Sequence, residues 1–268
     1  MSPDSRPTAP YQDARFLESS TARPLRILAE YLSPLETFRR ERIHDTVVFF
    51  GSARIAPDGP LGRYYEDART LARLVTAWSK GLPSGSARYI VCSGGGPGIM
   101  EAANRGASEA GGKTVGLNIG LPYEQRPNRW ITRELSFEFR YFFMRKLWFA
   151  HLARALVVFP GGFGTLDELT EILTLQQTGK LARRTPVLLY GPTFWKEILN
   201  FDALVRHGVI SPEDLDLFTY ADDPDAALRL LQSWLRPEEE GPTPAIAPSR
   251  WSGAGPGGAA EGGDPPGR

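Results

Sequence analysis

Short apolar runs alternate along this chain with amphipathic segments, and the alternation predicts strands and helices in turn. The apolar runs predict buried strands at Thr46–Phe50, Tyr89–Cys92, Thr114–Leu117, Leu156–Phe159, Pro186–Tyr190 and Leu217–Tyr220. Apolar residues at helical spacing predict helices at Tyr64–Lys80, Ile99–Ala110, Phe137–Ala153, Thr165–Thr178, Phe194–Val205 and Pro224–Leu235. Strands that alternate with helices of about 10 to 15 residues indicate an α/β protein with a mostly parallel sheet and helices on both faces.

The two ends of the chain differ from this repeating unit. Pro24–Arg42 has the pattern of an extra amphipathic helix, interrupted at Pro34. Residues 1–20 are rich in Ser, Pro and charge, and residues 237–268 are mostly Pro, Gly, Ala and Glu. Neither segment carries enough apolar surface to form a core. We therefore expect a disordered arm over 1–20, a single domain over 21–236 and a disordered tail over 237–268.

Small residues follow three of the predicted strands, at Gly51–Ser52, Ser93–Gly98 and Pro160–Thr165. Ligands of open parallel sheets bind at the carboxyl ends of the strands, so three such turns can converge on one ligand. The same glycines could instead only close tight turns. Neither glycine-rich turn is a Walker loop or has the spacing of the dinucleotide fingerprint, which disfavours NAD.

The third turn leads directly into a helix, and this arrangement is typical of an anion site. The N–H groups of the first helical turn and the helix dipole attract a negative charge. Gly161, Gly162 and Gly164 allow the backbone to approach it closely. We expect a phosphate-bearing ligand here.

Thr165 and Glu168 allow two interpretations. As a structural motif, Thr-x-x-Glu is a capping box, in which Thr165 caps the helix and Glu168 reaches back to a backbone N–H. As chemistry, the same spacing places a carboxylate at the rim of the phosphate site, where it could stabilise positive charge or activate water. Spacing alone leaves both open.

Arg145 and Lys146 lie within the aromatic segment Phe137–Ala153. Charged residues are rarely buried without a partner, so the pair should reach a cleft, an interface or solvent. A solvated helix face is the simpler alternative.

The composition excludes several classes of function. The chain has 268 residues and a formal net charge of zero, which gives no electrostatic reason to bind nucleic acid or a membrane surface. Cys92 is the single cysteine, and its place at the end of an apolar run suggests a small buried hydrophobe. The three histidines are scattered, so we expect no metal site. The N-terminus has no apolar signal core, and we expect a cytoplasmic protein.

Several motifs together resemble the LOG (Lonely Guy) family, some members of which are also called lysine decarboxylase-like. The longer N-terminal region is similar to that of the larger bacterial members. The matching segments are SGGGPGIMEAANRGA (Ser93–Ala107), PGGFGTLDE (Pro160–Glu168), FFGSAR (Phe49–Arg54), GLNIGLPYEQRPN (Gly116–Asn128) and FFMRK (Phe142–Lys146).

The resemblance implies a Rossmann-like three-layer fold and a phosphoribohydrolase. Such an enzyme cleaves the N-glycosidic bond of a purine nucleoside 5′-monophosphate, either a cytokinin riboside 5′-monophosphate or, as an AMP nucleosidase, AMP. The family pattern places the catalytic pair at Arg145 and Glu168. The candidate substrate- and phosphate-binding residues are Gly51, Ser52, Gly95, Gly96, Gly98, Lys146, Gly161, Gly162, Gly164 and Thr165.

The resemblance also implies a homo-oligomer, a dimer or a multiple of dimers, with no cofactor. Phe142-Phe143 and Phe163 depart from the shorter plant-type members, which leaves the base specificity open. Two alternatives remain. One is a non-catalytic nucleotide-binding or carrier protein with the same phosphate loops. The other is a pyridoxal-phosphate decarboxylase, although no lysine stands in a recognisable cofactor motif.

Overall fold

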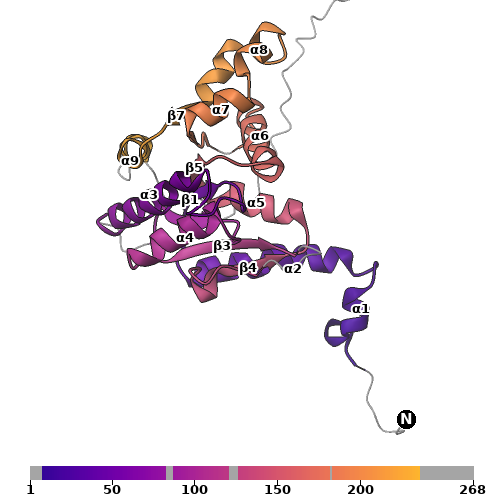
Figure 1. The fold of residues 1–268 in the computed structure, drawn as a ribbon. Coiled ribbons are helices and arrows are strands. Elements are labelled where there is room, and N and C mark those ends of the chain that lie inside the picture. The colour runs from indigo at the N-terminus through magenta and orange to yellow at the C-terminus, as the bar shows by residue number, and fades with distance from the viewer. Residues whose placement is uncertain (1–7, 83–86, 121–125, 182, 236–268) are drawn as a thin grey trace, which may run out of the picture.

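The structure is a computed structural model that describes residues 8–82, 87–120, 126–181 and 183–235. Within these residues one all-parallel sheet has the strand order β4-β3-β2-β1-β5-β6-β7 (Figure 1). Its strands are β1 (Thr46–Phe50), β2 (Ile90–Ser93), β3 (Thr114–Ile119), β4 (Ser136–Phe139), β5 (Ala153–Val158), β6 (Val187–Tyr190) and β7 (Phe218–Ala221).

Helices connect the strands and cover both faces of the sheet. The α-helices are α1 (Ala14–Glu18), α2 (Arg23–Arg40), α3 (Gly62–Lys80), α4 (Ile99–Glu109), α5 (Phe142–Leu152), α6 (Phe163–Gln177), α7 (Pro192–Ile198), α8 (Phe201–Arg206) and α9 (Pro224–Trp234). The described residues also form the short 3-10 helices η1 (Pro10–Gln12), η2 (Arg133–Leu135) and η3 (Pro212–Leu217). The predicted Rossmann-like α/β class is confirmed.

Successive side chains of each strand enter two different cores, because side chains alternate between the faces of a sheet. In β1, Val47 and Phe49 pack into the core under α3, α4 and α9. Val48 and Phe50 pack into the opposite core, under α2, α5, α6 and α7. Burial on both faces explains why the strands are almost wholly apolar in sequence.

The predicted N-terminal helix is α2, and it continues through Pro34 without a break. Its inner face packs on α5: the rings of Tyr31 and Phe38 lie 5.7 and 5.3 Å from Trp148, whose indole N–H donates to the Glu30 carbonyl. This packing holds the helix together across the backbone N–H that proline lacks.

The order of the strands reverses between β1 and β5. β1 pairs with β2 on one side and with β5 on the other, and Phe50 lies opposite Val158 at their carboxyl ends. Ligands of open α/β sheets bind where the strand order reverses. The fold therefore places its natural ligand crevice beside Gly51 and Pro160.

Two predicted helices are wrong in extent. The segment Phe137–Ala153 is not one helix, because Ser136–Phe139 forms the edge strand β4 before α5 begins. The segment Phe194–Val205 forms two helices, and Asn200 caps the second through the Ala203 N–H.

The predicted tail at 237–268 and residues 1–7 of the predicted arm lie outside the described residues, whereas Pro10–Glu18 forms η1 and α1.

Candidate active site

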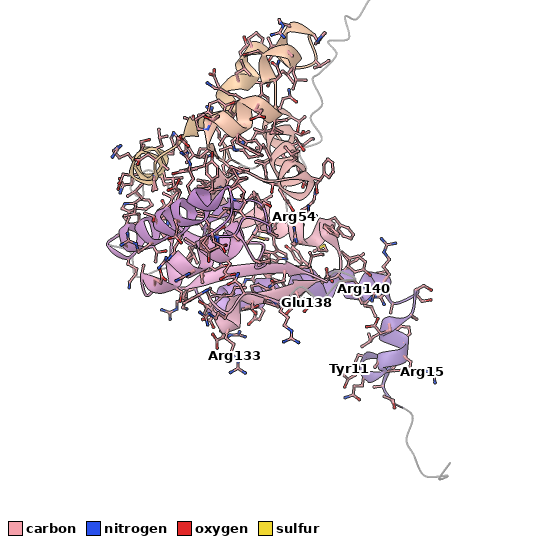
Figure 2. The ribbon with its side chains drawn as sticks, in the orientation of Figure 1. Tyr11, Arg15, Arg54, Arg133, Glu138 and Arg140 are labelled. Atoms are coloured by element: carbon pink, nitrogen blue, oxygen red, sulfur yellow. The ribbon has the colours of Figure 1, made fainter. Side chains whose placement is uncertain are left out.

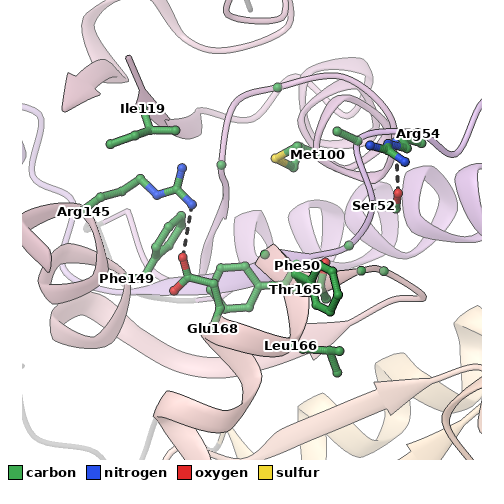
Figure 3. A pocket seen from close by; sticks show the side chains of 18 of the residues that line it. Phe50, Ser52, Arg54, Met100, Ile119, Arg145, Phe149, Thr165, Leu166 and Glu168 are labelled. Atoms are coloured by element: carbon green, nitrogen blue, oxygen red, sulfur yellow. Dashed lines mark hydrogen bonds and ion pairs between the residues drawn. The ribbon is translucent and has the colours of Figure 1, made fainter. Parts of the chain in front are cut away.

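A cavity of about 720 Å³ opens at the carboxyl edge of the sheet, beside the ends of β1 and β5 (Figure 3). Residues from all three glycine-containing turns line it, together with residues of α5 and α6. The predicted site residues among its lining are Gly51, Ser52, Gly96, Arg145, Gly161, Gly162, Gly164, Thr165 and Glu168. The three turns thus converge on one cavity, as their positions after adjacent strands predicted.

Two of the predicted glycines shape the cavity without lining it. Gly98 has φ of +68°, and a Cβ there would collide with the carbonyl of Ser52. Gly95 has φ of +76°, and a Cβ there would collide with the side-chain amide of Asn118. Any larger residue at either position would push the β2–α4 turn away from its neighbours.

Of the two interpretations of Thr165 and Glu168, the capping box is wrong. Helix α6 begins at Phe163 with Gly162 as its N-cap, so Thr165 is already inside the first turn. No side chain caps the helix, and the Glu168 carboxylate does not return to the backbone. Glu168 is one turn further into the helix than the box requires, and its carboxylate faces the cavity instead (Figure 3).

Glu168 forms an ion pair with Arg145, which comes from the neighbouring helix α5. An Nη atom of Arg145 donates to the Glu168 carboxylate at 3.1 Å, and the side chains are 15% and 6% exposed. Burial raises the pKa of Glu168, and the charge and hydrogen bond of Arg145 oppose that rise. The Arg145 Nε is itself buried and has no hydrogen-bond partner in the structure. The guanidinium lies between the rings of Phe142 and Phe149, each centroid 5.5 Å away.

Lys146 does not line the cavity, although it follows Arg145 directly. Its ammonium group lies 2.8 Å from Asp167 and 2.9 Å from Glu171, both on α6. Consecutive helical residues point about 100° apart, so a helix can turn only one of the two toward the site. Lys146 instead ties α5 to α6.

The remaining wall of the cavity is largely apolar. Its side chains include Phe50, Met100, Ile119, Phe142, Phe149 and Phe194. A second cavity of about 310 Å³ shares Ser52, Arg54, Gly161 and Phe194 with the first and continues beyond them. An elongated ligand with a flat apolar part fits such a space.

No group of His, Cys, Asp or Glu side chains suited to a metal ion occurs among the described residues. Within the same part of the chain no helix is long and apolar enough to cross a membrane. Cys92 is buried in β2, and burial raises the pKa of its thiol, so it is protonated and inert as a nucleophile.

The chain is similar to plant phosphoribohydrolases. A family model described as "Possible lysine decarboxylase" matches residues 100–231. Cytokinin riboside 5′-monophosphate phosphoribohydrolase LOG7 of Arabidopsis thaliana is 31% identical over 150 residues, which cover 54% of this chain and 66% of that protein. The corresponding LOG5 is 30% identical over 167 residues, which cover 60% of this chain and 69% of that protein. The chain belongs to the LOG family.

A solved structure agrees with the fold of this LOG-family chain. The X-ray structure of TM1055, a structural genomics target, superposes with a TM-score of 0.51 at 21% identity, over 70% of this chain and 99% of that one. At this identity the likeness concerns the fold. The aligned parts of LOG7 and LOG5 span about two thirds of those proteins.

A buried hydrogen-bond network holds one of the glycine turns of this LOG-family site. Asn104 of α4 is fully buried; its amide N–H groups donate to Thr114 Oγ1 and the Val115 carbonyl, and its Oδ1 accepts from Ser93 and Asn128. The amide of Asn128 also donates to the carbonyls of Gly95 and Gly96, at 3.0 and 3.1 Å. Nothing in the spacing of the sequence marks these two asparagines as partners. They fix the turn that forms one wall of the cavity.

Two polar residues of the cavity were not predicted. Arg54 lines it from the β1–α3 loop, and Asn118 lines it from the end of β3. Both lie in segments that carry the family resemblance, FFGSAR and GLNIGLPYEQRPN. Their positions just after or at the end of a strand are the signal that could have identified them. The polar loop after β3 lies partly outside the described residues, at 121–125.

Proposed function

We propose that this chain hydrolyses the N-glycosidic bond of purine nucleoside 5′-monophosphates, with release of the free base and ribose 5-phosphate. The observation that carries the proposal is the buried Arg145–Glu168 ion pair, which faces a cavity that also contains the first turn of α6. The relatives LOG7 and LOG5 are named as cytokinin riboside 5′-monophosphate phosphoribohydrolases, which supports the same reaction class. AMP and its prenylated analogues are the proposed substrates.

Glu168 is the proposed catalytic carboxylate. When the bond from C1′ to the base nitrogen breaks, its electron pair leaves with the base and positive charge develops on the ribose. A carboxylate beside the ribose stabilises that charge, and the effect is large where water is excluded. Glu168 then accepts a proton from the water whose oxygen bonds to C1′. The departing base takes up one proton and Glu168 releases the one it accepted, so one water is added across the bond and the products are neutral base and ribose 5-phosphate.

Arg145 favours the ionised form of this carboxylate. Burial alone favours the protonated acid, which could neither stabilise the oxocarbenium-like ribose nor accept a proton. The guanidinium lowers the pKa of Glu168 against that tendency.

The direct test is to supply the purified protein with AMP and no added metal. We expect adenine and ribose 5-phosphate in equal amounts, measured by chromatography. Adenosine should react far more slowly, because the remote phosphate supplies binding energy that positions the ribose. Competition between AMP and prenylated AMP then identifies the preferred base. Tight binding without turnover of any purine monophosphate would instead establish a nucleotide carrier, and an absorption band of an internal aldimine would support the decarboxylase.

A cytoplasmic homo-oligomer is the proposed form of the enzyme. Phe142, Phe143 and Leu147 on α5 and Phe163 at the start of α6 are exposed, Phe163 by 93%, and Phe142 and Phe163 also line the cavity. Monomeric proteins rarely expose such grouped large apolar side chains. We expect light scattering after size-exclusion chromatography to give the mass of a dimer or a multiple of dimers; a monomer at micromolar concentration would contradict this.

A further inference from the structure

Some of the charged side chains that line the cavity are paired with one another, and one is not. Among the described residues, Arg54 and Arg145 are the cationic side chains in its lining, and Glu168 is the acidic one. Arg145 is paired with Glu168, so these two charges neutralise one another. A nucleoside monophosphate brings up to two negative charges into this space. The ion pair alone does not compensate them.

Arg54 is the cation that remains. Its side chain makes no hydrogen bond or ion pair with any other residue that the structure describes, and it is exposed. Lys146, the other nearby cation, is held by Asp167 and Glu171 outside the cavity. A cation that lines a ligand cavity without a protein partner is suited to an anionic ligand.

The backbone at Arg54 is nevertheless well fixed. The Ser52 N–H donates to the Pro160 carbonyl at 3.0 Å, and the Ser52 carbonyl accepts from the Ile99 N–H at 3.1 Å. The Arg54 N–H donates to Ser52 Oγ at 3.0 Å, and the next residue, Ile55, is buried. The loop is therefore attached to both glycine-rich turns, and Arg54 leaves it at a defined point.

Arg54 and Arg145 lie on opposite sides of the cavity in Figure 3, with Thr165 of the α6 first turn between them. A nucleoside monophosphate has its phosphate at one end of the ribose and the scissile bond at the other. If the scissile bond lies at Glu168, the phosphate extends toward Thr165 and Arg54. Arg54 then lies at the phosphate end of the substrate, and Arg145 lies at the end that carries the scissile bond.

We propose that Arg54 binds the 5′-phosphate of the substrate, in place of the predicted Lys146, while Arg145 serves the carboxylate of Glu168. The assignment rests on the proposed function for the identity of the substrate. It concerns binding, however, and can be tested without turnover. Ser52, whose hydroxyl is fixed by the Arg54 N–H, lies beside it in both cavities.

The experiment is calorimetric titration of ribose 5-phosphate and of ribose into the wild-type protein and three variants. Arg54→Gln should weaken ribose 5-phosphate binding by roughly 10- to 100-fold, the range for one hydrogen-bonded charge. Arg54→Lys should restore part of the affinity. Arg133→Gln is the matched control, because Arg133 is an exposed arginine that points into solvent away from the cavity (Figure 2). It should bind as the wild type does, and all variants should keep the wild-type melting temperature.

The same variants separate the two proposals by kinetics. Arg54→Gln should raise KM for AMP with a much smaller change in kcat, because the phosphate is bound alike in the ground state and the transition state. Unchanged ribose 5-phosphate affinity in Arg54→Gln would overturn the role of Arg54 and leave the hydrolase proposal standing. A wild-type protein that binds ribose 5-phosphate through Arg54 but releases no base would overturn the hydrolase alone. Absence of any ribose 5-phosphate binding to the wild type would overturn the phosphate site at Arg54, while adenine release from AMP still decides the hydrolase.

Discussion

Glu168→Gln should lower kcat for AMP by roughly 10²- to 10⁴-fold, the usual contribution of a positioned acid–base group, while the fold is retained. The amide has nearly the same shape and can still accept the hydrogen bond from Arg145, but it carries no charge and takes no proton. Steady-state release of adenine measures the loss. Glu171→Gln, one turn along α6 and outside the cavity lining, is the matched control and should keep most of the activity.

The stability of Glu168→Gln distinguishes a catalytic carboxylate from a structural one. Burial raises the pKa of Glu168 above its ordinary value of 4.5. The folded protein then binds this proton more tightly than the unfolded chain, so the favourable contribution is complete below pH 4.5 and is lost as pH rises through the raised pKa. At neutral pH the ionised carboxylate lowers the stability of the fold, so the variant should melt no lower than the wild type. A clear fall in melting temperature together with retained activity would contradict the assignment.

Arg145→Met should also remove most of the activity, by roughly 10²- to 10³-fold, the loss typical when one preorganised charge is removed. Its distinctive effect is on pH dependence. The wild-type kcat/KM should fall in acid as Glu168 becomes protonated, with a midpoint above 4.5. Without the guanidinium, which lowers the pKa of Glu168, that midpoint should move to higher pH. Residual activity measured between pH 4 and 9 provides the comparison.

Lys146→Met is the control for Arg145→Met. It removes the adjacent positive charge from the same helix but leaves the cavity lining intact. We expect most of the activity to remain and the acid midpoint to rise only slightly, since Lys146 makes a smaller contribution to the pKa of Glu168 than Arg145 does. Equal losses of activity in the two variants would mean that Arg145 and Lys146 act only by joining α5 to α6.

The sheet was predictable from sequence because its strands are buried on both faces. Their apolar runs are nearly continuous, and the turns that follow them are marked by glycine. β4 was missed because it is an edge strand: in Ser136–Phe139 exposed residues alternate with more buried ones, and the aromatic residues that follow extended the apparent helix backward. The break between α7 and α8 is likewise local, since it depends on Asn200 as a cap.

The site was only partly predictable, because side-chain direction depends on where each helix begins. A start at Thr165 would have made Glu168 a cap, whereas the actual start at Phe163 turns Glu168 into the cavity. In the same way, the orientation of α5 decides which of Arg145 and Lys146 faces the cavity. Arg54 could not be predicted as a site residue because an arginine in a loop is common. Its role is inferred only from the structure, in which the other cations near the cavity, Arg145 and Lys146, are paired with carboxylates.

The order of the strands has a consequence for how the protein folds. β1 and β5 are neighbours in the sheet, yet about one hundred residues of chain separate them, and closing so long a loop is entropically costly and slow. The walls of the cavity come from both sides of that junction: Gly51 and Ser52 follow β1, and Gly161 to Glu168 follow β5. Neither half of the chain contains the site by itself. Ligand binding during refolding should therefore appear late, when the two halves of the sheet join, and would report that step specifically.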